Sequence, residues 1–174
     1  MIIPIKGLRP HSPLFLAPGA FLIGDVRVGK DVSIWYGAVV RADINYIEIG
    51  DRTNIQDLCV LHVTEELPVV IGPDVTIGHR VVVHGACIEP ACLVGMGAVI
   101  LDGARIGEGS IVAAGSVVRE GVEFPPRSLI AGVPATVKRT VSDEEYCAIV
   151  ASARHYVNYA REYLESTGRT DETV

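Results

Sequence analysis

Three histidines stand at positions where they could bind one metal ion. His62 directly follows Leu61, His84 directly follows Val83, and His79 lies five residues before His84. Neutral imidazoles bind Zn²⁺ at about 2.0–2.1 Å, and three of them leave the fourth tetrahedral position to water. Zinc lowers the pKa of such a water to about 7 and so supplies hydroxide at neutral pH. The residue types and spacing therefore suggest a catalytic metal site.

The chain around these histidines follows a six-residue repeat. A branched aliphatic residue returns at every sixth position in blocks of three, and glycine often follows it. Neither an α-helix nor an alternating strand has this period. Six residues make one short strand and a corner, three strands close a triangular coil, and coils stack about 4.8 Å apart. The sequence thus predicts a mainly β protein, a parallel β-helix. The predicted core residues are Val28, Ile34, Val40, Ile49, Ile55, Leu61, Ile71, Ile77, Val83, Ile88, Val94, Ile100, Ile106, Val112 and Val118.

The repeat sorts the polar side chains into columns. His62 and His84 follow the third aliphatic residue of adjacent coils, and Arg41 follows the third of the preceding coil, so these residues share a column. His79 lies on the second face, below Asp57, and cannot easily reach round its own corner. His79 of a neighbouring chain could meet the pair, and closing such a contact calls for threefold symmetry. We therefore expect a homotrimer with three metal sites between subunits.

A simpler interpretation is open for each histidine, because a lone histidine is usually a surface or hydrogen-bonded residue. His62 and His84 alone could be two incidental members of one column. The addition of His79, with Gln56 and Asp57 one coil above it, favours a metal site.

Three interruptions break the repeat. The step to the next aliphatic residue is nine residues after Val40, ten after Leu61 and five after Val83. Insertions in a solenoid form loops that project from one edge, often the binding edge. We expect both longer insertions to be loops of this kind.

The last part of the chain has a helical pattern. After Val118 the repeat fades, and residues 131–135 (Ala-Gly-Val-Pro-Ala) indicate an exit where proline prevents the ladder from continuing. Ser142 and Glu145 have the spacing of a capping box. Apolar residues then recur at helical spacing up to Gly168.

Length and composition fit one domain. The chain has 174 residues, of which 49% are hydrophobic and 21% charged, a globular balance. We expect residues 1–135 to form the β-helix with its N-terminal lead-in. Residues 136–174 would add a C-terminal helix, packed along the prism, and a frayed tail to the same domain.

The charge and the cysteines restrict partners and compartment. The formal charge of −6 and the absence of a Lys/Arg run argue against nucleic acid or a membrane and favour small solutes. The four cysteines lack Cys-x-x-Cys spacing, and the chain shows no signal peptide and no stretch of 18 apolar residues. We expect a reduced, cytoplasmic protein in which Cys87 and Cys92 fill coils.

The order of these residues resembles the gamma-class carbonic anhydrases. Five segments carry the resemblance: Arg41-Ala42-Asp43, Asn54-Ile55-Gln56-Asp57, Leu61-His62, Ile77-Gly78-His79 and Val83-His84-Gly85. It covers roughly residues 10–135, and the C-terminal helix is also similar. Many acyltransferases share hexapeptide repeats, whereas the histidines with Arg-x-Asp and Asn-x-Gln-Asp are much more specific. The resemblance implies a left-handed β-helix and reversible hydration of CO₂ to bicarbonate by a metal-bound hydroxide.

The resemblance also implies a ligand set. His62 and His84 of one subunit and His79 of the next would hold Zn²⁺, with Fe²⁺ or Co²⁺ as alternatives. Gln56 would orient the hydroxide through a hydrogen bond.

Further roles follow from the same resemblance. Arg41 and Asp57 would pair across the subunit interface in the bidentate geometry that suits arginine. Asp43 and Asn54 would support the ligands and the substrate through hydrogen bonds. Tyr156 matches a family position that lines the pocket, and the packing of an amphipathic helix explains it equally well.

The chain departs from the family's active prototype in two places. Ile44 stands where the prototype has glutamate, and the short segment 64–68 stands where it has a long acidic loop. Both places bear on proton export. Glu65 is the candidate relay, although a charged residue in a short loop is commonly just a solvated turn.

Two other functions stay open at this point. A hexapeptide-repeat acyltransferase would use one histidine as general base and coenzyme A as donor, which the shared repeat and the Ala-Gly-Val-Pro-Ala exit favour. A noncatalytic metal-binding subunit is favoured by Ile44 and the short loop.

Overall fold

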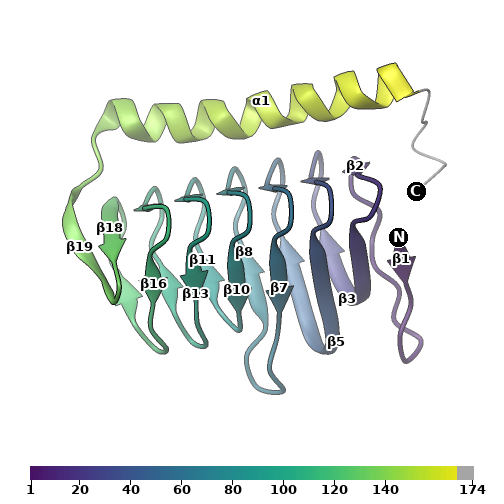
Figure 1. The fold of residues 1–174 in the computed structure, drawn as a ribbon, viewed down its shortest axis with the longest axis horizontal. Helices are drawn as coiled ribbons and strands as arrows, with labels where there is room; N and C mark the ends of the chain where they lie inside the picture. Colours follow the sequence, from purple (N-terminus) through teal and green to yellow (C-terminus); the bar gives the residue numbers. More distant parts are fainter. Residues whose placement is uncertain (168–174) are drawn as a thin grey trace.

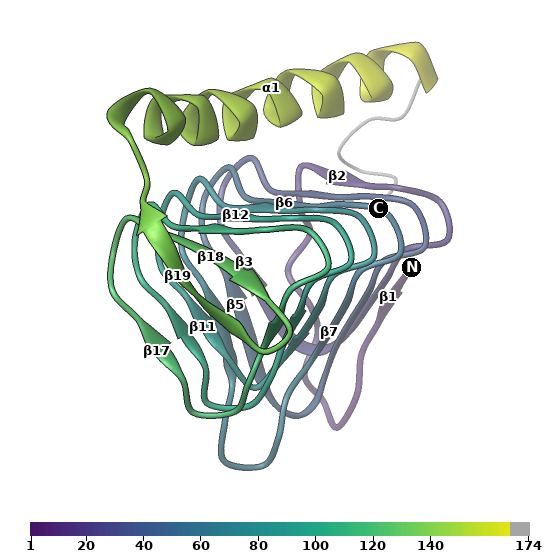
Figure 2. The ribbon, with the colours of Figure 1, turned by 60° about the vertical axis from the view of Figure 1, so that its left-hand side comes forward.

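The strands of the protein stack into a solenoid. A computed structural model describes residues 1–167, and its coils pair in parallel along one axis (Figure 1). Figure 2 shows the roughly triangular cross-section of the coils and a helix lying over one face. The predicted parallel β-helix with a C-terminal helix is confirmed.

Two sheets within residues 1–167 make up the three faces. The first sheet contains β1 (Ile2–Ile3), β3 (Phe21–Val28), β5 (Val39–Ile49), β7 (Val60–His62), β8 (Val69–Ile71), β10 (Val82–His84), β11 (Cys87–Ile88), β13 (Val99–Ile100), β14 (Arg105–Ile106), β16 (Val117–Val118) and β17 (Glu123–Phe124). The second contains β2 (Phe15–Leu16), β4 (Ser33–Ile34), β6 (Asn54–Ile55), β9 (Thr76–Ile77), β12 (Leu93–Val94), β15 (Ile111–Val112), β18 (Ser128–Gly132) and β19 (Ala135–Thr140). The first half of β5 pairs with β7 and its second half with β8, so β5 carries the first sheet round a corner.

The aliphatic rows predicted from the repeat form the core. All fifteen predicted core residues except the half-buried Val28 are buried, and they align with their counterparts on adjacent coils. Full burial of such a side chain contributes about 1.5–3 kcal/mol. The rows continue beyond Val118 through Phe124 and Ile130. The expected fading is therefore wrong, since the repeat extends by two further six-residue steps.

The longer interruptions of the repeat take two different forms. The residues after Val40 do not form the expected loop, because they continue as β5 and pair with β3. The later insertion does form a loop, residues 64–68, which projects between β7 and β8 (Figure 1). The Asn45 side-chain amide donates to the carbonyl oxygens of Thr64 and Glu65, each at 3.1 Å, and ties this loop to β5.

The chain leaves the solenoid through a β-hairpin. β18 and β19 pair antiparallel around Val133 and Pro134. The expectation that the ladder ends at this exit is wrong, because the chain reverses and pairs once more.

The capping box is confirmed at the start of α1 (Asp143–Thr167). The Glu145 backbone N–H donates to Ser142 Oγ at 3.2 Å, and the Ser142 backbone N–H donates to Glu145 Oε2 at 2.9 Å. The expected tail after Gly168 lies outside the described residues.

α1 lies lengthwise over the face of the second sheet. It contacts β2, β4, β6 and β9 and buries Ile149, Ala153, Val157 and Ala160. Ala160 joins Phe15 and Trp35 in a second, smaller core. Within residues 1–167 no helix has both the length and the apolar stretch that a membrane span requires.

The cysteines differ from one another in burial. Burial raises the pKa of the Cys59 and Cys92 thiols to about 12, and Cys92 fills a coil as predicted. Cys87 does not fill a coil, because it is only half-buried and lies 3.8 Å from an Arg105 guanidinium nitrogen. Cys147 is exposed on α1.

Candidate metal centre

The solenoid brings His62 and His84 together. Their strands β7 and β10 pair in register, with Arg41 of β5 aligned on the preceding coil. His62 Nδ1 lies 3.0 Å from His84 Nε2, and the ring centroids are 5.0 Å apart. The predicted column is therefore present, and its two histidines point at each other.

A carboxylate holds the far nitrogen of each ring. His62 Nε2 lies 3.1 Å from Asp43 Oδ1, and His84 Nδ1 contacts Asp102 Oδ1. An ionised carboxylate only accepts hydrogen bonds, so each ring must direct its N–H toward the carboxylate. With neutral rings in this arrangement, the two facing nitrogens both carry lone pairs.

Two lone pairs at this distance call for a cation between them. Two nitrogens bound to zinc at 2.0–2.1 Å with a tetrahedral angle stand about 3.3 Å apart, close to the 3.0 Å between these atoms. Carboxylates that fix the far nitrogen of metal-binding histidines are typical of such sites. The donor set of His62 and His84 therefore fits a divalent metal.

Asp43 links this pair to Arg41. Arg41 Nη1 donates to Asp43 Oδ2, while Asp43 Oδ1 lies against His62. Burial acts to raise the pKa of Asp43, but the hydrogen bonds from His62 and Arg41 together lower this pKa below its ordinary value. Asp43 is thus held as a charged acceptor, and its supporting role at a metal stays a prediction.

His79 lies at a different place, after β9 of the second sheet. Its Nδ1 is 2.7 Å from Asp57 Oδ2, which makes it an ion pair when the imidazole is protonated. Both residues line an open cavity of about 450 Å³ whose remaining walls are aromatic. The aromatic residues are Trp35, Tyr36, Tyr156, Tyr159 and Tyr163.

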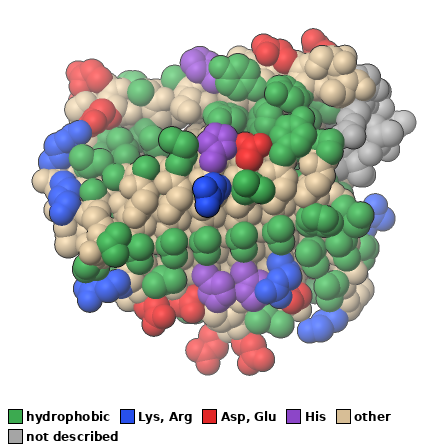
Figure 3. Space-filling view, viewed as in Figure 1, with side chains coloured by type: hydrophobic (Ala, Val, Ile, Leu, Met, Phe, Trp, Pro, Cys, Tyr) green, Lys and Arg blue, Asp and Glu red, His purple; other side chains and the backbone are tan. Residues whose placement is uncertain are grey.

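A row of apolar side chains separates the two histidine locations. Val39, Val60, Val82, Val99 and Val117 align on β5, β7, β10, β13 and β16, and each is exposed or half-buried. We call these residues the valine row. Figure 3 shows a band of hydrophobic side chains on this face with histidines on both sides of it.

One protomer does not assemble the predicted three-histidine set. Among residues 1–167, no group of three His, Cys, Asp or Glu side chains is placed to hold a metal. Within the protomer Arg41 pairs with Asp43, and Asp57 pairs with His79. The expected pairing of Arg41 with Asp57 between subunits stays a prediction.

Gln56 and Asn54 form a buried network at the end of β6. Gln56 Nε2 donates to Asn54 Oδ1 at 3.2 Å, and Asn54 Nδ2 donates to Thr76 Oγ1 at 2.9 Å. Gln56 directly precedes Asp57, so it belongs to the His79 side of the molecule.

Tyr156 both packs and lines the cavity. Its ring meets Trp35 edge-to-face with centroids 5.5 Å apart, and its side chain borders the same cavity as His79. Burial, and then the charges of Asp57 and Tyr159, raise the pKa of Tyr156. The two interpretations of this residue are therefore compatible.

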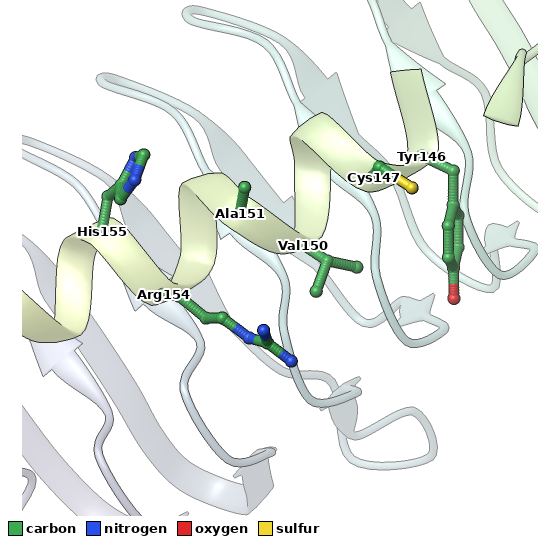
Figure 4. Close-up of a pocket in the computed structure, with 6 residues that line it drawn as sticks. All are labelled: Tyr146, Cys147, Val150, Ala151, Arg154 and His155. Carbon is green, nitrogen blue, oxygen red and sulfur yellow. The ribbon is translucent and has the colours of Figure 1, made fainter. Parts of the chain in front are cut away.

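The remaining candidates lie at the surface. Glu65 is exposed in the loop 64–68, and Ile44 is exposed on β5. A separate pocket of about 360 Å³ runs along α1 and contains none of the predicted site residues (Figure 4). Its lining includes Tyr146, Arg154 and His155.

Asp102 is the residue that the sequence analysis missed. It follows Ile100 by two positions, just after the place that His62 and His84 occupy on their own coils. Extending the histidine column by one coil would have drawn attention to it.

The repeat defines a broad class of protein. Residues 88–120 match the family model described as bacterial transferase hexapeptide (six repeats). A solved structure from Bacillus cereus, described as a candidate acetyltransferase, has a TM-score of 0.89 and 40% identity, covering 94% of this chain and 96% of that one. The chain is therefore a hexapeptide-repeat β-helix protein.

Two relatives narrow the class to a family. The chain is 53% identical over 151 residues to the "Probable carbonic anhydrase" of Methanocaldococcus jannaschii, covering 87% of this chain and 94% of that protein. It is 41% identical over 167 residues to the mitochondrial gamma carbonic anhydrase 2 of Arabidopsis thaliana, covering 92% of this chain and 60% of the plant protein. The chain belongs to the gamma carbonic anhydrase family and is a carbonic anhydrase-like enzyme.

Proposed function

We propose that the protein is a metal-dependent carbonic anhydrase that interconverts CO₂ and bicarbonate as a homotrimer. The observation that carries this proposal is the 3.0 Å approach of His62 Nδ1 and His84 Nε2, with a carboxylate on the far nitrogen of each ring. Relatives named as carbonic anhydrases support the same reaction. A cytoplasmic location stays a prediction.

The valine row supports a trimer. His79 precedes β10 and His84 ends it, so the chain crosses a whole face between the two histidines, with the half-buried Val82 on that face. A neighbouring protomer that brings its His79 to this His84 would cover the valine row. Repeating that heterologous contact three times closes a ring.

Different residues of the chain would bind the metal and orient the attacking water. His62 and His84 of one protomer and His79 of the next would hold zinc, with Fe²⁺ or Co²⁺ as alternatives because imidazole suits several divalent metals. A bound zinc ion lowers the pKa of water and so supplies the nucleophile at neutral pH. Gln56, fixed by its hydrogen bond to Asn54, would accept a hydrogen bond from the attacking water and orient it.

Groups near the proposed metal site would bind CO₂, bind bicarbonate and transfer the proton. The aromatic cavity beside His79 suits apolar CO₂, and the Arg41 guanidinium, held by Asp43, suits anionic bicarbonate. Glu65 remains the candidate for carrying the proton to solvent.

Substitution of His84 tests the proposal. We expect His84→Ala to lose bound metal and to lower CO₂ hydration by more than about 100-fold, beyond the loss typical of a supporting residue. His155→Ala, on the exposed side of α1, is the control and should match the parent protein. Metal analysis of anaerobically purified protein and stopped-flow CO₂ hydration measure both effects. A metal-loaded trimer that is inactive with zinc, iron and cobalt would reject the proposal and favour a noncatalytic metal-binding subunit.

Acyl transfer is the second candidate, favoured by the description of the Bacillus cereus structure as a candidate acetyltransferase. That function needs one histidine as general base and a site for coenzyme A. The paired histidines, each with its own carboxylate, favour metal binding instead. Saturable binding of coenzyme A by the metal-free protein, together with inactivity toward CO₂, would support acyl transfer.

A further inference from the structure

Asp102 contacts a candidate metal ligand from the next coil. It lies in the turn after β13, and its Oδ1 meets the Nδ1 of His84. The Asp102 side chain is about one-third exposed, so this contact lies at the surface of the solenoid.

Glycine at position 85 leaves room for the contact. A Cβ built on Gly85 would lie 2.8 Å from Asp102 Oδ1 and 3.2 Å from Leu67 Cβ. Any larger residue would push the carboxylate away from His84. The backbone also joins these coils, since the Gly103 N–H donates to the Gly85 carbonyl at 2.8 Å.

The contact determines which nitrogen of His84 carries the proton. A carboxylate at Nδ1 requires the N–H there, which leaves the Nε2 lone pair directed at His62. We propose that Asp102 is a positioning residue that holds His84 in the Nδ1–H tautomer and presents Nε2 to the metal. The metal part of this inference rests on the proposed function, whereas the tautomer part does not.

Glu120 provides a matched control. It precedes Gly121 as Asp102 precedes Gly103, and the Gly121 N–H donates to the Asp102 carbonyl at 2.8 Å, so Glu120 occupies the equivalent corner one coil further on. Glu120→Ala removes a carboxylate from that corner, where it is exposed. Asp102→Ala removes the one that touches His84.

The first experiment reads the tautomer in the metal-free protein. We expect ¹⁵N NMR of histidine-labelled protein, at a pH where the rings are neutral, to give the Nδ1–H signature for His84. Asp102→Ala should change it to the Nε2–H form or to a mixture, and Glu120→Ala should not. An unchanged signature in Asp102→Ala would overturn the proposal.

The second experiment measures zinc affinity by competition with a chromophoric chelator. Asp102→Ala should weaken zinc binding by about 10–100-fold, and Glu120→Ala should leave it within about twofold. Asp102→Asn keeps an acceptor oxygen and should lose less than Asp102→Ala. Gly85→Ala keeps the Asp102 carboxylate but pushes it away from His84, so it should also weaken zinc binding. This variant keeps the test valid if Asp102→Ala does not fold.

These outcomes separate the two proposals. If the parent binds no zinc, or if His84→Ala binds as well as the parent, the proposed function fails and the tautomer result is unaffected. If His84→Ala loses zinc but Asp102→Ala loses less than about tenfold, the role of Asp102 is wrong and the metal site survives.

Discussion

The two histidine locations are built in different ways. His62 and His84 lie on paired strands, and carboxylates of the same chain orient both rings. His79 lies at a corner beside α1, held by Asp57 within an aromatic cavity. We call these locations the paired half and the corner half of the candidate centre.

The difference shows what each half depends on. The register of β7 and β10 fixes the paired half, so it is formed within a single protomer. The corner half depends on how α1 packs against β9 and its neighbours, and it carries only one imidazole. In the proposed centre the core would therefore supply two ligands in advance, and the third would need a helix and a second protomer.

A charge in the valine row should have the largest effect, because it should prevent one protomer's paired half from meeting the corner half of the next. Val82→Asp places a carboxylate in the surface expected to be covered, where burying it without a partner is costly. We expect dissociation to monomers and a loss of CO₂ hydration of about 100-fold or more. Analytical ultracentrifugation and stopped-flow assays measure these effects. Val137→Asp, on exposed β19, is the control, and a Val82→Asp trimer with parental activity would contradict the account.

A smaller effect is expected at Tyr156 in the corner half. Tyr156→Phe keeps the ring against Trp35 but removes the hydroxyl from a residue that lines the cavity. A hydrogen bond from such a hydroxyl to a substrate would be worth about 0.5–1.5 kcal/mol. We expect kcat/KM for CO₂ to fall roughly 3- to 10-fold with an unchanged melting temperature. Unchanged kinetics would assign Tyr156 to packing alone.

The smallest effect concerns the start of the helix that supports the corner half. Hydrogen bonds from Arg139 and from the Ser142 backbone lower the pKa of Glu145 from 4.5 to about 2. Because the folded-state pKa is the lower one, this stabilisation is present above pH 4.5 and is lost as the pH falls toward 2.

Two substitutions test the capping box. Glu145→Gln should flatten the pH dependence of unfolding between about pH 4.5 and 2, and Ser142→Ala should cost about 1 kcal/mol. Denaturant unfolding followed by circular dichroism measures both, with Glu162→Gln on the same helix as control. An unaltered pH profile in Glu145→Gln would show that this pair does not stabilise α1.

The sequence predicts most of the fold because the core has a fixed period. Once six-residue steps are recognised, the burial of residues such as Ile55 and Ile77 and the alignment of His62 with His84 follow from strand register. The continuation through Phe124 and Ile130 also keeps this step, but the two prolines after Phe124 make the sequence pattern look interrupted there.

Other features depend on contacts that a period does not encode. The insertion after Val40 became part of β5 because Ala42, Ile47 and Ile49 turn inward and are buried. Asp102 reaches His84 only because Gly85 lacks a side chain. Pairing between subunits, as expected for Arg41, depends on a second copy of the chain.

Mixing two inactive variants tests the shared site most directly. His79→Ala keeps the paired half, and His84→Ala keeps the corner half. If each centre takes its halves from different protomers, trimers formed from an equal mixture should regain activity and zinc at roughly one quarter of the sites. We predict that recovery when the variants are co-refolded and assayed for CO₂ hydration. A mixture as inactive as its two components would contradict the account.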